Sequence, residues 1–165
     1  MKPEVTLSTR ALDNETRLDR TLTYRLHLLH KLSDRVSQFA YVNDAGLSMS
    51  EGRCLAAIGS FEPLSVNDLA QQANLNKGQA SRAAQGLVDQ GLVKKDMSAA
   101  DARGVVLTLT PKGAKKWQRV MQVIARRNEE IFGCLTAGEQ ERLSRMFDRM
   151  IAHALVSADD AAVKE

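Results

Sequence analysis

The stretch NLNKGQASRAAQGLVDQGLVKK, from Asn74 to Lys95, decides the fold because it places small residues where a helix built only for packing carries Leu and Ile. Helical periodicity over residues 76–89 separates it into two sides. The inward side consists of Ala80, Ala83, Ala84, Leu87 and Val88. The outward side consists of Lys77, Gln79, Ser81, Arg82 and Gln85. A helix this slender can lie in a major groove about 12 Å wide while its back packs on a partner helix.

The residues before this helix predict a helix-turn-helix. Ser65 to Asp68 (SVND) has the pattern of a capping box, so a short helix begins there. Asn74 follows at the turn, where Asn tolerates the left-handed conformation. Asn76 can cap the slender helix, and Gly91 stands at its C′ position.

Two predicted strands follow, residues 92–95 and 104–110, and the second alternates apolar and polar residues with period two. The small, polar segment from Asp96 to Arg103 is too long for a tight turn, so the hairpin carries an extended loop. A helix-turn-helix followed by such a hairpin is a winged helix.

Long helices flank this unit. The first begins near Asp13 or Asn14, spans about 28 residues, and carries an apolar stripe that reaches beyond its own subunit: Leu18, Leu22, Leu26, Leu29, Leu32, Val36 and Phe39. Ser48 to Glu51 opens a helix that Gly59 and Pro63 close. Thr110 and Pro111 open another, with the stripe Ala114, Trp117, Met121, Ile124, Asn128 and Ile131. Thr136 to Glu139 opens the last, with inward positions Leu143, Met146, Phe147, Met150, Ile151 and Ala154.

Charge is distributed unevenly along the 165 residues. The formal net charge is +3, but residues 77–127 carry eleven Lys and Arg against three Asp, a net of +8. A basic middle is typical of a surface that binds a polyanion, although a solvated face is an equally simple interpretation. No apolar run suits a membrane span or a signal peptide, so we expect a cytoplasmic protein without membrane contact. Its two cysteines fit neither a disulfide framework nor a metal knuckle.

The outward residue types suit duplex DNA. Arg82 can form a bidentate contact with guanine and Gln79 or Gln85 with adenine, while Ser81 and Lys77 can hold phosphates. Near the hairpin tip, Arg103 stands two residues after Asp101, and a narrow minor groove attracts an inserted Arg. The alternatives are an ordinary polar surface helix and an exposed loop arginine.

The chain resembles the MarR family of bacterial transcription regulators from about Leu18 to Leu155. The resemblance rests on LSMSEGRCLAAI, DLAQQANLNKGQASRAAQGLVDQGLVKK and DAR followed by LTLTPKG. It implies a mainly α fold with a small β-hairpin wing, in which a winged helix-turn-helix joins a helical dimerisation region. The expected parts are an N-terminal extension and long dimerisation helix over 1–45, the winged helix over 46–110, and dimerisation helices and a tail over 111–165.

The resemblance further implies a homodimer that binds a pseudo-palindromic operator, with Arg103 in the minor groove and Asp101 orienting it. Together with Asn76, the outward residues of the slender helix complete the expected DNA contacts. Family members often have Trp where this chain has Gly52, which predicts altered packing and an enlarged pocket there. Gly86 replaces a commonly charged residue, which removes one possible phosphate contact.

Relatives of this kind commonly repress genes until a small molecule, often an aromatic acid, binds between the dimer helices and the winged helix. His27, His30 and Arg53 are the candidate ligand-binding groups, with ordinary surface or core roles as the alternative. We expect no metal site and no cofactor. A thiol- or metal-responsive regulator of the same fold and a basic winged-helix protein-interaction module are the remaining alternatives. No catalytic constellation is recognisable, so an enzyme is not expected.

Overall fold

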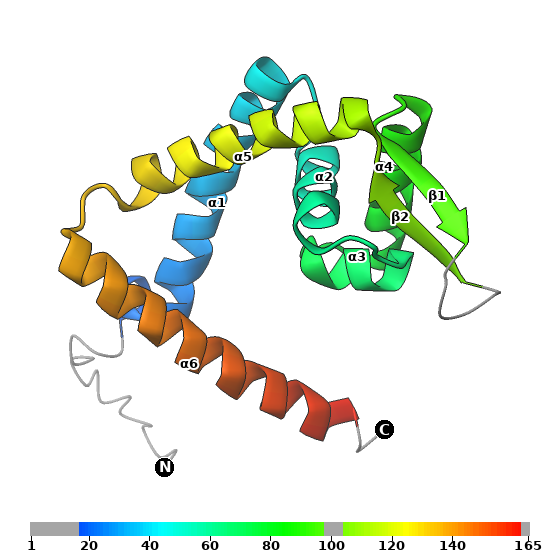
Figure 1. Ribbon diagram of the computed structural model, residues 1–165. Coiled ribbons are helices and arrows are strands. Elements are labelled where there is room, and N and C mark those ends of the chain that lie inside the picture. Colours follow the sequence, from blue (N-terminus) through cyan, green and yellow to red (C-terminus); the bar gives the residue numbers. More distant parts are fainter. Residues whose placement is uncertain (1–16, 98–103, 163–165) are drawn as a thin grey trace, which may run out of the picture.

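The computed structural model describes residues 17–97 and 104–162, with side chains described as far as Val156. Its elements are η2 (Leu18–Arg20), α1 (Leu22–Ala40), η3 (Tyr41–Ala45), α2 (Met49–Phe61), α3 (Val66–Gln72), α4 (Lys77–Asp89), β1 (Val93–Met97), β2 (Val105–Leu109), α5 (Pro111–Phe132) and α6 (Ala137–Ala162). In Figure 1, α2 to β2 gather at one end, α5 runs from them to α1, and α6 stands apart from the winged-helix elements. The predicted mainly α fold with a hairpin wing is confirmed.

Reciprocal caps begin the three helices of the winged-helix unit where the sequence predicts them. Ser48 with Glu51, Ser65 with Asp68, and Asn76 with Gln79 each form a capping box. The predicted turn residue Asn74 has a φ of 52°, and Gly91 after α4 has a φ of 68°. Both backbone positions are left-handed, which explains Asn and Gly there.

The wing is an antiparallel pair in which Val93 lies opposite Leu109 and Met97 opposite Val105. Leu64 adds a single bridge to Leu107, exchanging both backbone hydrogen bonds with it. Leu107 is fully buried while Val105 is exposed. The strand therefore buries its predicted inner face only near α5, and its outer half extends toward the loop.

One apolar core joins these elements. Its largest fully buried side chains come from α2, α3, α4, the residue before β1, both strands and α5: Leu55, Ile58, Leu69, Leu87, Leu92, Val93, Leu107 and Val120. Ala80 and Ala84 of α4 are also buried, so the slender side of α4 faces this core as predicted.

The first long helix is shorter than predicted and is interrupted at both ends. Thr21 is extended, with φ −68° and ψ 142°, and its side chain accepts a hydrogen bond from the Tyr24 N–H at 3.4 Å. The helix therefore begins at Leu22, while Asp13 and Asn14 lie outside the described residues. At its other end the chain widens into the π-helical segment η3, which Gly46 ends with a φ of 62°.

Two further predictions about helices were wrong. Gly59 does not end α2, which continues to Phe61. Instead, a Cβ at Gly59 would lie 2.4 Å from Cδ1 of Trp117, so the glycine makes room for that ring. In α5, the predicted stripe member Ala114 is exposed, because the fully inward positions are Gly113, Val120, Val123 and Arg127.

The apolar stripes of α1 and α6 lie on the surface of this single chain. Leu22, Leu26 and Leu32 are more than half exposed on α1. On α6 the predicted inward positions are half-buried or exposed, with Met150 at 52% and Ile151 at 57%. The prediction that these positions face inward was wrong. As far as Val156, α6 buries no residue against the rest of its own chain. In the described part of the chain, no helix is long and apolar enough to cross a membrane.

Cys54 belongs to the core and is fully buried. Burial, reinforced by the nearby Glu51 carboxylate, raises the pKa of its thiol to about 12. Cys134, in the turn between α5 and α6, is exposed. Since the thiolate is the reactive form, Cys54 is an inert core thiol at neutral pH.

We expect Gly59→Ala to lower stability by about 1–3 kcal/mol, because the added methyl overlaps the Trp117 ring. Ala is otherwise the better helix former by about 1 kcal/mol. Urea unfolding measures the change. The matched control is Gly138→Ala in α6, where an added Cβ meets no atom within 4 Å. Stabilisation by Gly59→Ala would contradict the packing described here.

We also expect a thiol reagent at pH 8 to modify Cys134 rapidly and Cys54 only after unfolding. At that pH the Cys54 thiol, with its pKa raised to about 12, stays protonated as well as shielded. Mass spectrometry of the native and denatured protein identifies the labelled residue, and Cys134→Ser provides the control. Rapid labelling of Cys54 in the native protein would show that the thiol is accessible.

Candidate nucleic-acid interface and adjoining cavity

The outward side of α4 is a continuous polar surface. Lys77, Gln79, Ser81, Arg82 and Gln85 are all exposed, whereas the alanines behind them are buried. Gly78 is exposed as well, so the backbone at the start of α4 is open to close approach. The structure therefore brings together the polar residues that the sequence assigned to one side.

Asn76 and Gln79 hold each other at the start of α4. Oδ1 of Asn76 accepts the Gln79 backbone N–H at 2.8 Å, and Oε1 of Gln79 accepts the Asn76 backbone N–H at 3.2 Å. The amide group of Gln79 still carries two N–H donors, since only its oxygen serves the cap. Capping thus fixes the side chain of Gln79 rather than removing it from the surface.

Gln85 links α4 to the wing, a role that sequence reasoning missed. Its Oε1 accepts from Nζ of Lys95 at 2.7 Å, and its Nε2 donates to Oδ1 of Asp89 at 2.7 Å. Lys95 is exposed on β1 beside α4, which adds a cation to the polar surface. The signal available in the sequence was the Lys94–Lys95 pair shortly after the helix C-terminus.

Gly86 is half-buried and lies close to the side chain of Glu51. A Cβ at this position would lie 2.8 Å from Oε1 of Glu51, the same oxygen that accepts from Nε2 of Gln90 at 2.7 Å. Glu51 thereby connects the start of α2 to the end of α4. The glycine is explained by this close approach, while the predicted loss of a phosphate contact stays a prediction.

The charged residues of the two wing strands all lie on β1. Nζ of Lys94 lies 2.8 Å from Oδ2 of Asp96, which also accepts from the Thr108 hydroxyl at 3.0 Å. These two hydrogen bonds, that of Lys94 first, lower the pKa of Asp96. Asp101 and Arg103, the expected minor-groove pair, lie outside the described residues.

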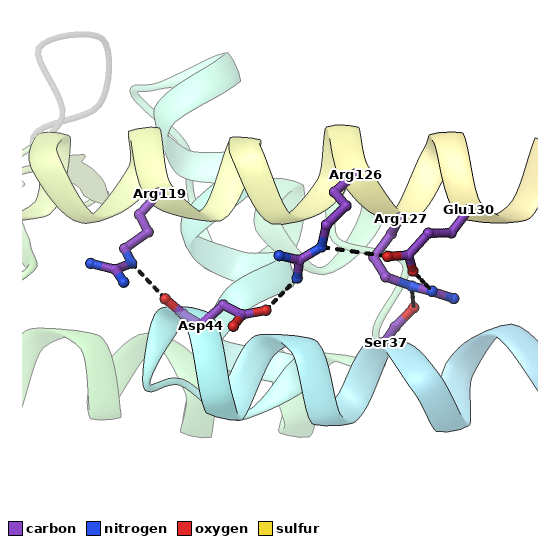
Figure 2. A network of polar contacts seen from close by, with 6 residues as sticks. All are labelled: Ser37, Asp44, Arg119, Arg126, Arg127 and Glu130. Carbon is purple, nitrogen blue, oxygen red and sulfur yellow. Dashed lines mark hydrogen bonds and ion pairs between the residues drawn. The ribbon is translucent and has the colours of Figure 1, made fainter. Parts of the chain in front are cut away.

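Much of the basic middle of the chain does not face outward from the winged helix. Figure 2 shows Arg119 and Arg126 of α5 directed at Asp44 of η3: the Arg119 Nε donates to the Asp44 carbonyl at 2.6 Å, and Arg126 pairs with its carboxylate. Arg127 is buried, donates to the Ser37 hydroxyl of α1 at 3.3 Å and pairs with Glu130. These arginines attach α5 to α1 and η3, so the net charge of residues 77–127 overstates the charge available to a polyanion.

A cavity of about 660 Å³ lies where α1, η3, α2 and α5 meet the turn before α4. Its apolar lining includes Phe61, Met121 and Ile124, and its polar lining includes Ser60, Gln72 and Asn74. This combination of an apolar wall with a few polar groups is the usual make-up of a small-molecule site.

Two of the three predicted ligand-binding residues, His30 and Arg53, line this cavity, whereas His27 is not among its lining residues. Sequence reasoning missed Asp34, which lies between them. Its Oδ1 is 2.8 Å from Nη2 of Arg53, and its Oδ2 is 3.3 Å from Nε2 of His30. The available signal was the i, i+4 spacing of His30 and Asp34 on α1. Among the described residues, no group of His, Cys, Asp and Glu is arranged to hold a metal ion.

Tyr41 occupies the space that Gly52 leaves. A Cβ at Gly52 would lie 2.4 Å from Cδ1 of the Tyr41 ring, which is buried and lines the cavity. Burial raises the pKa of Tyr41, partly offset by the positive charge of Arg53. The glycine therefore admits an aromatic ring from η3, and that ring fills the space beside it.

Comparison with known proteins agrees with this architecture. Residues 45–104 match the sequence model of the MarR family. The HTH-type transcriptional repressor Rv2887 of Mycobacterium tuberculosis is 26% identical over 111 residues, covering 67% of this chain and 80% of that protein.

Solved structures show the same fold. A MarR family transcriptional regulator from Silicibacter pomeroyi has a TM-score of 0.73 at 22% identity, covering 84% of this chain and 93% of that one. Rv2887 in complex with p-aminosalicylic acid has a TM-score of 0.65 at 25% identity, covering 79% and 98%, and it is also known in complex with salicylic acid. The chain is therefore similar to MarR family transcription regulators in the sequence of residues 45–104, and it shares their fold.

Proposed function

We propose that the protein binds a pseudo-palindromic operator as a homodimer, with α4 of each copy in a major groove. The observation that carries this proposal is the division of α4 into a buried alanine side and an exposed polar side. Arg82 and Gln79 are the groups suited to base edges, while Lys77, Ser81 and Lys95 suit phosphates. In the proposed complex Gln85 acts mainly by holding Lys95.

The second copy is proposed from the apolar surface of the helices outside the winged helix. Leu26 and Leu32 on α1 and Met150 and Leu155 on α6 are about half exposed or more. A large exposed apolar surface of this kind marks an interaction site. The proposed dimerisation parts are residues 1–45 and 111–165, and the proposed reading part is 46–110.

The wing is proposed to add a minor-groove contact through Arg103, oriented by Asp101. β1 and β2 extend away from the core toward the loop that carries both residues. An arginine inserted there gains from the enhanced negative potential of a narrow minor groove.

The cavity is proposed to hold an aromatic carboxylic acid whose binding releases the DNA, so that the protein acts as a repressor. Support comes from the related repressor Rv2887, whose structures contain p-aminosalicylic and salicylic acid. In this chain, Arg53 supplies a guanidinium at the cavity wall and Phe61, Met121 and Ile124 supply apolar surface for a ring.

We expect Arg82→Ala and Gln79→Ala each to weaken operator binding by about 1–3 kcal/mol and to relax base preference, since each side chain can pair with a base edge. Arg103→Ala should weaken binding less selectively. Fluorescence anisotropy with the DNA that flanks the protein's own gene measures affinity. Its logarithm should fall with the logarithm of salt concentration with a slope of about −0.9 per phosphate neutralised.

The control for Arg82→Ala is Arg145→Ala, which removes an exposed arginine from α6. Sedimentation of each variant should give two copies per particle, so that lost affinity is not lost dimerisation. If Arg82→Ala and Gln79→Ala left affinity and base preference unchanged, α4 would not be the reading element.

We expect salicylic acid to weaken operator binding by the native protein, and neutral salicylamide to have little effect, because the proposed contact with Arg53 needs a carboxylate. Arg53→Gln should lose this response but still bind the operator, since Arg53 lies at the cavity and not on the outward side of α4. Because the substitution also breaks the ion pair with Asp34, its operator affinity without ligand is the reference for its response. Anisotropy titration with each compound is the measurement. An equal response to the acid and the amide would contradict a carboxylate site.

A further inference from the structure

The carboxylate of Asp34 already forms an ion pair with Arg53, the cation that an acidic effector would bind. Asp34 lies on α1, and Arg53 lies on α2 with Nη2 only 2.8 Å from Oδ1 of Asp34. Both side chains are about 30% exposed, so the pair is partly shielded from solvent. His30 lines the cavity beside them and contacts the second oxygen of Asp34.

This arrangement cancels the positive charge of the cavity. Arg53 contributes +1 and Asp34 contributes −1, and Asp34 does not line the cavity itself. An entering carboxylate therefore meets an arginine that is already neutralised and a like charge close behind it. The carboxylates of the ligand and of Asp34 would repel each other when both lie beside Arg53, and the repulsion is stronger where water is partly excluded.

The same ion pair also connects two parts of the molecule. α1 is attached to α5 through the hydrogen bond of Arg127 to Ser37, whereas α2 contributes Leu55 and Ile58 to the winged-helix core. Asp34 and Arg53 thus join a helix outside the winged helix to a helix that packs on α4. Loss of the ion pair would leave α1 and α2 freer to change their relative position.

We propose that Asp34 competes with the effector for Arg53. An aromatic carboxylate takes the place of the Asp34 carboxylate on the Arg53 guanidinium, and the broken ion pair releases α2 from α1. The inference rests on the proposed effector function of the cavity and adds the residue that sets its affinity. Competition from Asp34 lowers the affinity for the acid, so the protein stays on DNA until the acid is abundant.

The test uses salicylate as the probe and the full-length chain. Isothermal titration should show that Asp34→Asn binds salicylate about tenfold more tightly than the native protein, since the substitution removes the competing charge and keeps the side-chain shape. Asp34→Glu, which restores the charge, should return the affinity toward the native value. The matched control is Asp19→Asn, which breaks an exposed pair with Arg17 outside the cavity and should change nothing.

The direction of the change separates competition from damage. A variant that merely loosens the fold binds salicylate more weakly, so tighter binding by Asp34→Asn supports competition. Equal or weaker binding overturns it, while the proposed effector function stands if the native protein still releases DNA with salicylate. Binding by Asp34→Asn alone also supports competition, because Asp34 then excludes the acid from the native cavity. If neither protein binds salicylate, both the inference and the aromatic-acid effector are rejected.

DNA binding without salicylate tests whether breaking the Asp34–Arg53 ion pair releases α2 from α1. Asp34→Asn should bind the operator several-fold more weakly than the native protein, because the connection between α1 and α2 is already weakened. Asp19→Asn again serves as the control. Tighter salicylate binding with unchanged operator affinity would retain the competition and overturn the release of α2 as its consequence.

Discussion

The close approach of α4 to its neighbours is the constraint on which the rest of the structure depends. Ala80 and Ala84 are almost fully buried, so at these two positions α4 contributes only a methyl group to its packing against α2 and α3. Larger side chains there would displace the whole outward surface. Gly86 is a further small residue on α4, and its lack of a side chain leaves room for Glu51 to accept a hydrogen bond from Gln90 at the end of the helix. The position of the polar surface is thus set by small residues behind it.

A second set of contacts, polar rather than apolar, connects this unit to the long helices. α5 begins beside the wing, where Thr110 caps it and Lys112 donates to the carbonyl of Gln90 at the end of α4. Farther along, Lys116 donates to the carbonyl of Ala45, and Arg126 pairs with Asp44 (Figure 2). One rigid helix therefore contacts both α4 and η3. Movement of η3 relative to the winged helix would require these bonds to change.

How much could be predicted from the sequence depends on whether a feature is local. The caps at Ser48, Ser65 and Asn76 and the left-handed Asn74 were predictable, because each depends on residues within three positions. The role of Gly59 was not, because its reason is the ring of Trp117, far away in sequence. The same holds for the site: the outward face of α4 follows from periodicity, whereas the pairs of Gln85 with Lys95 and of Arg53 with Asp34 need tertiary placement.

The apolar stripes of α1 and α6 are not buried within a single chain. Periodicity correctly found an apolar row on α1 and another on α6, but it placed the α6 row inward, whereas both rows lie on the surface of the single chain. In a single chain these rows are exposed, while Arg119 and Arg127 of α5 are hydrogen-bonded to η3 and α1 instead of facing a polyanion. Burying the rows in a second copy would fix α1 in the dimer. The cavity between α1 and α2 would then lie between a fixed helix and the winged helix, so a ligand that moved α2 away from α1 would move α4 relative to the rest of the proposed dimer.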